Sequence, residues 1–141
     1  MDDVDHGHTR LAHTVDAVIE AWAPTAAQCY EEAAAALVEV FADTSAAAEG
    51  SLESFDVGPG RPEELLAMLL EEIVFDANER GHVPIVTEVD VSGDCLVGKF
   101  ASLPIENVDI RGPIPETISS SDLEFRRSDN GWRCRATIDA R

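Results

Sequence analysis

The sequence predicts a single α+β domain in which two amphipathic helices pack on a mixed β-sheet. Its 141 residues are the size of one ordinary domain, and a hydrophobic content of 45% is enough for a buried core. Two segments repeat apolar residues at helical spacing, whereas most of the other apolar segments alternate as strands do. The predicted order along the chain is β-α-β-α-β-β-β-β.

The first predicted strand covers residues 13–23, where small and branched apolar residues occupy alternate positions. Pro24 closes this strand, and Thr25 with Gln28 has the spacing of a capping box at the start of a helix. The apolar positions of that helix are Tyr30, Ala33, Ala34, Leu37, Val40 and Phe41. Its glutamates fall largely on the opposite face, as is typical of a helix with one buried side.

A short strand is expected over residues 51–57, and the run Gly-Pro-Gly at 58–60 separates it from a second helix. Pro62 suits the first turn of this helix, and Gly81 is a suitable C-terminal stop. The predicted buried stripe consists of Leu65, Leu66, Leu69 and Ile73.

The C-terminal half contains two expected hairpins. One covers residues 84–102 and turns at Gly93-Asp94; the other turns at residues 129–131 and ends in a strand of clean alternation. Its inward positions are Trp132, Cys134, Ala136, Ile138 and Ala140. Between the hairpins, three prolines and a glycine predict a long surface loop over residues 103–117, and the serines at 119–121 fit a polar strand.

Residues 1–11 are expected to form a flexible acidic N-terminal tail, and residues 12–141 the folded domain. His6 and His8 stand among aspartates in this tail, but an unordered segment gives a metal ion no fixed coordination geometry. The start lacks the apolar core of a signal peptide, and no later segment is apolar enough to span a membrane. A cytoplasmic protein without a membrane partner is therefore expected.

The charge balance argues against direct, tight nucleic-acid binding, since 10 Lys and Arg face 28 Asp and Glu, for a net charge of -18. Nucleotide-binding glycine motifs are absent from the sequence. The three cysteines, Cys29, Cys95 and Cys134, have no metal-ligand spacing, so reduced packing residues are expected.

Two aspartates are the candidate metal ligands. Asp16 lies near the start of the first predicted strand and Asp139 near the end of the last; if the terminal strands are neighbours, the two carboxylates could hold a hard cation. The alternative is that each is a solvated acid in an acidic chain. His13 is an accessory candidate, either as a hydrogen-bond partner of such a site or as a local packing residue.

Both ends of the chain resemble the archease family. Archeases open with His-Thr-Ala-Asp and close with Gly-Trp followed, after six residues, by Asp; here these motifs are His13-Thr14-Val15-Asp16 and Gly131-Trp132 through Asp139. The resemblance implies an accessory protein, not an enzyme, that helps an RtcB-type RNA ligase become guanylylated from GTP and turn over repeatedly. It also implies a divalent metal ion, with Ca²⁺ preferred over Mg²⁺ or Mn²⁺, held by Asp16 and Asp139 near the Ala140 backbone.

One departure from the family pattern leaves the partner open. The family often has a lysine followed by Val-Thr-Tyr-His before the last hairpin, whereas Glu116 takes the lysine position here and Ser120 and Ser121 replace tyrosine and histidine. The alternatives are therefore an archease-like metal-binding module with another protein partner, or a small metal-dependent hydrolase. For the hydrolase, Glu20 is the nearest acid on the same strand face as Asp16.

Overall fold

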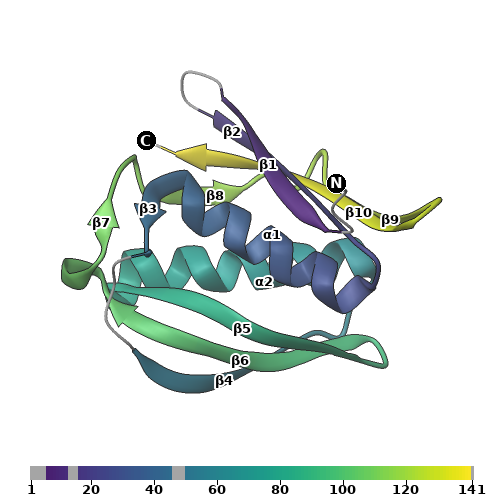
Figure 1. Ribbon diagram of the computed structural model, residues 1–141, viewed down its shortest axis with the longest axis horizontal. Helices are drawn as coiled ribbons and strands as arrows, with labels where there is room; N and C mark the ends of the chain where they lie inside the picture. Colours follow the sequence, from purple (N-terminus) through teal and green to yellow (C-terminus); the bar gives the residue numbers. More distant parts are fainter. Residues whose placement is uncertain (1–5, 13–15, 46–49, 141) are drawn as a thin grey trace.

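The computed structural model describes residues 6–12, 16–45 and 50–140, with side chains except at 9–12, 16 and 140 (Figure 1). The first half contains β1 (Gly7–Ala12), β2 (Asp16–Ala23), α1 (Ala26–Phe41), β3 (Ala42–Asp43), β4 (Ser51–Val57), α2 (Pro62–Phe75) and a π-helical turn (Asp76–Arg80). The second half contains β5 (His82–Ser92), β6 (Cys95–Pro104), a 3₁₀ turn (Ile105–Asn107), β7 (Asp109–Ile110), β8 (Pro115–Ile118), β9 (Glu124–Ser128) and β10 (Gly131–Ala140).

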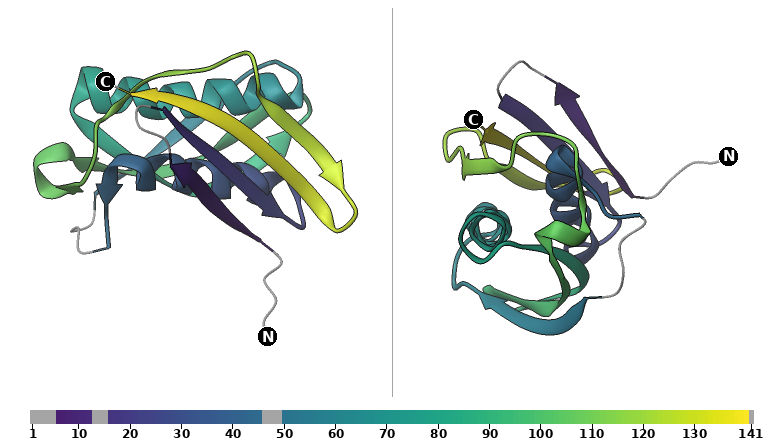
Figure 2. Two further views of the ribbon diagram at one scale, coloured as in Figure 1. Left: turned by 90° about the horizontal axis from the view of Figure 1, so that it is seen from above. Right: turned by 90° about the vertical axis from the view of Figure 1, so that its left-hand side faces the viewer.

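The two helices lie between two antiparallel sheets (Figures 1 and 2). One sheet has the order β1-β2-β10-β8, with β9 also paired to β10, and the other has the order β4-β6-β5. A third, two-stranded sheet joins β3 to β7. The first and last long strands, β2 and β10, are therefore neighbours at the centre of one sheet, although more than a hundred residues separate them.

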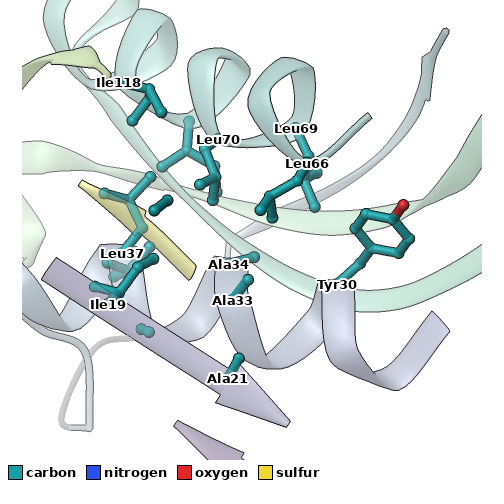
Figure 3. Close-up of a cluster of buried hydrophobic side chains, with 14 of the residues drawn as sticks. Ile19, Ala21, Tyr30, Ala33, Ala34, Leu37, Leu66, Leu69, Leu70 and Ile118 are labelled. Atoms are coloured by element: carbon teal, nitrogen blue, oxygen red, sulfur yellow. The ribbon is translucent and has the colours of Figure 1, made fainter. Parts of the chain in front are cut away.

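The core forms where α1 and α2 meet each other and the sheets (Figure 3). Leu37, Leu66 and Leu70 are fully buried, and Ala33 and Ala34 of α1 are each 1% exposed. Small alanine side chains let the helices approach closely while the leucines fill the space between them. Tyr30 stacks on Phe125 of β9 with ring centroids 4.1 Å apart, which ties α1 to the C-terminal hairpin.

The predicted helix boundaries are confirmed. Thr25 is the N-cap of α1, and its hydroxyl oxygen accepts from the Gln28 backbone N–H at 3.1 Å. In place of the reciprocal bond of a capping box, the Gln28 side-chain oxygen accepts a hydrogen bond from the Thr25 hydroxyl at 3.4 Å. Pro62 is the first residue of α2, and Gly81, at φ 67°, ends the π-helical turn that extends it.

The eight expected elements correspond in order to β2, α1, β4, α2, β5, β6, β9 and β10, but three expectations about other segments are wrong. Residues 7–11 of the expected tail belong to β1, which pairs along β2. The expected loop at 103–117 contains the end of β6, β7 and most of β8, and Leu103, Val108 and Pro115 are buried. These strands are not predicted from the sequence because the prolines interrupt the alternating pattern that marks a strand. Residues 119–121 form no strand: 120 and 121 lie in bends, and the Ser119 and Ser121 hydroxyls hydrogen-bond to each other.

Candidate metal centre

The two predicted metal ligands occupy neighbouring backbone positions. Antiparallel pairing places Asp139 of β10 directly opposite Asp16 of β2, at the end of the ladder between these strands. Directly opposite residues in an antiparallel pair have Cβ atoms about 4.5–5.5 Å apart. The condition that the sequence left open, adjacency of the terminal strands, is therefore met.

On its other side, Asp139 is opposite Thr117 of β8, whose hydroxyl donates to Asp139 Oδ2 at 3.1 Å. The register shifts between Asp139 and Ala140, so that Ala140 pairs with Pro115. Such a bulge bends a strand and re-aims the groups beside it, and bulges are common next to functional sites. The ladder between β10 and β8 is thus irregular beside Asp139, one of the candidate metal ligands.

The cross-strand pairs along β2 and β10 change character toward this end. Arg133 lies over the Trp22 ring at 5.3 Å, and Arg135 forms an ion pair with Glu20 at 3.0 Å. These partners are complementary, whereas Asp16 and Asp139 are both acidic. Like charges directly opposite each other destabilise a sheet unless a cation lies between them. The acidic pair is therefore the position on this ladder where a cation would stabilise the fold.

Two carboxylates beside backbone carbonyls fit a hard divalent cation, since Ca²⁺ and Mg²⁺ prefer oxygen ligands. Among the side chains that the structure describes, no group of three or more His, Cys, Asp or Glu could hold a metal ion. Asp139 is the carboxylate of the pair with a described side chain, and Ala140 contributes a backbone position. His13, the accessory candidate, lies outside the described residues.

Glu20, the third acid considered for a hydrolase, does not join this site. It lies four residues along β2 from Asp16, a distance of about 13 Å at the rise of a strand. Its carboxylate accepts from Arg135 Nη1 at 3.0 Å, so it is engaged with a cation of β10. Glu20 is therefore the ion-pair partner of Arg135 and does not lie beside Asp16 and Asp139.

The N-terminal histidines, expected in an unordered tail, instead contact α1. His8 places Nδ1 2.6 Å from Glu32 and Nε2 2.9 Å from Glu39, and His6 Nδ1 is 2.6 Å from Glu32. A carboxylate only accepts, so His8 must be doubly protonated to donate to both. Burial lowers the pKa of His8, but the hydrogen bonds to Glu32 and Glu39 outweigh it and raise that pKa above its ordinary value.

A groove of about 670 Å³, which the sequence does not predict, lies between the C-terminal end of α2 and β8. Glu116, at the position of the family lysine, lines this groove beside Thr117, the hydrogen-bond partner of Asp139. No signal in the sequence predicts the groove, because its two walls are about 40 residues apart and the strand β8 was not expected. The groove thus lies next to the acidic end of β10.

The protein is a small α+β domain in which two helices lie between two antiparallel sheets. Its candidate metal site, Asp16 with Asp139, lies where the strands β2 and β10 pair. A profile of the archease protein family matches residues 8–140. Over 134 residues the chain is 33% identical to the "Probable protein archease" of Mycobacterium tuberculosis, in strains CDC 1551 and H37Rv, covering 94% of this chain and 74% of that protein. The chain therefore belongs to the archease family.

Solved structures show the same fold. The solution structure of Methanobacterium thermoautotrophicum protein 1598 is similar with a TM-score of 0.76 at 22% identity, covering 94% of this chain and 98% of that one. The crystal structure of an archease from Thermotoga maritima, described as a possible chaperone, gives a TM-score of 0.64 at 13% identity and covers 94% of each chain. Among the described residues, no helix is long and apolar enough to cross a membrane.

Proposed function

We propose that this chain is a non-enzymatic activator of an RtcB-type RNA ligase and holds a divalent metal ion with Asp16 and Asp139. It promotes guanylylation of the ligase and its multiple turnover in tRNA splicing or RNA repair. The observation that carries the proposal is the cross-strand pairing of Asp16 with Asp139, at the end motifs of a chain matched to the archease family over residues 8–140.

In this proposal the metal, preferably Ca²⁺, is held by the two carboxylates and the backbone near Ala140. When bound, it supplies positive charge at the end of the ladder between β2 and β10 and removes the repulsion between the two aspartates. Thr117 keeps Asp139 oriented through its hydroxyl, which donates at 3.1 Å. The chain's own contribution is to hold the carboxylates on two hydrogen-bonded strands, so that little conformational freedom is lost on metal binding.

The charge of the chain supports a protein partner over RNA. At a net charge of -18, a phosphate backbone is repelled, whereas a basic surface on the ligase is attracted. An accessory role agrees with the description of the Thermotoga maritima relative as a possible chaperone. On this reading the chain acts in the cytoplasm and joins no RNA itself.

The test is multiple-turnover RNA ligation by the ligase from the same organism, with and without this protein. The unmodified protein is expected to increase the number of turnovers, and Asp139→Asn to lose most of that stimulation. Asp129→Asn is the matched control, since Asp129 lies in the turn before β10, at the opposite end of this strand from Asp139, and the change removes the same charge. Absence of stimulation by the unmodified protein would refute the activator function.

The same preparations separate the two alternatives. A small metal-dependent hydrolase would cleave a substrate without any ligase. The third acid considered for such an enzyme, Glu20, instead forms an ion pair with Arg135. A metal-binding module with another protein partner would show metal-dependent stabilisation that Asp139→Asn abolishes, together with no effect on ligation. Neither alternative predicts stimulated turnover.

A further inference from the structure

The groove beside the metal centre has an apolar floor and an acidic rim. Val74 of α2 and Ile118 of β8, each 8% exposed, form part of the floor. Glu71, Glu79 and Glu116 place three carboxylates around it. An open groove of about 670 Å³ with this lining can take side chains that combine an aliphatic stem with a positive charge.

A second hollow, of about 460 Å³, adjoins the first across the exposed face of α2. The two hollows share Glu71 and Phe75, and the second adds Asp56 and Glu72 to the carboxylates of the first. Phe75 is 46% exposed and is the one aromatic residue among the exposed large hydrophobic residues of the described chain. A half-exposed aromatic ring between two hollows is typical of a protein-binding surface.

Arg80, the cation that contacts Phe75, is already engaged with its own chain. Arg80 lies over the Phe75 ring at 5.2 Å and forms an ion pair with the buried Asp76 at 3.2 Å. Within the described residues, neither Glu71 nor Glu79 forms an ion pair with Lys, Arg or His. Glu71 and Glu79 thus give this side of α2 negative charge that no Lys, Arg or His of the described residues offsets by an ion pair.

We infer that the two hollows form one docking groove, centred on Phe75, for a lysine- or arginine-bearing segment of a partner protein. The stems of the partner's basic side chains pack on Phe75 and the apolar floor while their charged groups pair with Glu71 and Glu79. The inference rests on the proposed function, because the partner is taken to be the ligase. The groove would give the ligase a second binding site on this protein, separate from the metal ligands.

Other occupants fit the groove less well. Nucleic acid would place phosphates against carboxylates, and a second copy of this chain would bring another net charge of -18. Glu71 and Glu79 lie on exposed positions of α2 and the turn after it, which suits reversible pairing with a mobile basic segment. A basic protein segment is the occupant whose charge complements the groove.

The experiment measures ligase turnover against the concentration of this protein for a double variant, Glu71→Gln with Glu79→Gln. The expected result is that the half-maximal concentration rises about tenfold, as for the loss of two charge pairs, while maximal stimulation is retained at saturation. The control is Glu88→Gln with Asp90→Asn on β5, which removes the same charge from exposed positions outside the groove and should leave the curve unchanged.

A second variant, Phe75→Ala, keeps the charge and is expected to raise the half-maximal concentration several-fold as well. Equal thermal midpoints for the variants and the unmodified protein show that folding is intact. An unchanged half-maximal concentration in both groove variants overturns the groove while leaving the activator function in place, since Asp139→Asn lowers the maximum instead. If the unmodified protein stimulates nothing, the activator function fails and the groove inference falls with it.

Discussion

The sharpest prediction concerns Asp139→Asn and the stability that a metal ion confers. Without metal, the substitution removes repulsion of about 0.8 kcal/mol, for two charges about 5 Å apart in water. It also weakens the hydrogen bond from Thr117, worth about 0.5–1.5 kcal/mol. These effects oppose each other, so the metal-free free energy of unfolding should change by less than about 1 kcal/mol.

With metal, the two proteins should differ clearly. At a Ca²⁺ concentration 100 times its dissociation constant, the unmodified protein gains about 2.7 kcal/mol, which raises its thermal midpoint by about 8 °C. Asp139→Asn loses a ligand and should gain less than about 1 kcal/mol at the same concentration. Asp129→Asn, in the turn before β10, should behave as the unmodified protein does.

The assay is thermal and urea unfolding in a chelator, followed by titration with Ca²⁺, Mg²⁺ and Mn²⁺ separately. The ion with the largest shift at a given concentration identifies the preferred metal. A thermal midpoint of the unmodified protein that does not respond to any of the three ions would refute the metal site. So would a full shift in Asp139→Asn, because the site would then not need this carboxylate.

Two further predictions concern β1 and the turn of the C-terminal hairpin. Because Glu32 and Glu39 raise the pKa of His8 above 6.5 in the folded state, the stability from this contact is fully present below pH 6.5 and is lost as pH rises through the folded-state pKa. His8→Gln should therefore flatten that fall in urea-measured stability, and an unchanged slope would contradict it. Gly131→Ala should lower the free energy of unfolding by about 2–4 kcal/mol in the same assay. Gly131 has φ 149°, and a Cβ there would lie 2.2 Å from the Ala23 carbonyl oxygen. A decrease of less than about 1 kcal/mol would argue against this packing.

The elements that could be predicted are those whose signals are local. The capped start of α1 at Thr25, the proline at the start of α2, Gly81 and the two tight hairpin turns all follow from neighbouring residues, and the structure confirms them. The sequence does not predict β1 and β8, because neither has a clear alternation of apolar and polar residues; each forms a strand by pairing with a neighbour in the fold. β1 is polar and gains its place from β2 and from the contact between His8 and α1, whereas Pro115 interrupts the strand pattern of β8.

The sequence by itself determined the α+β class, the positions of both helices and the two aspartates at the ends of the chain, because capping, periodicity and turn chemistry act over a few residues. Only the tertiary structure decided that Asp16 and Asp139 are opposite each other, that Thr117 donates to Asp139, and that Glu116 lines the same groove as Glu71 and Glu79. Those relations depend on which strands pair and on how α2 packs against β8. Pairing of distant segments is a property of the whole fold, so no local pattern in the chain specifies it.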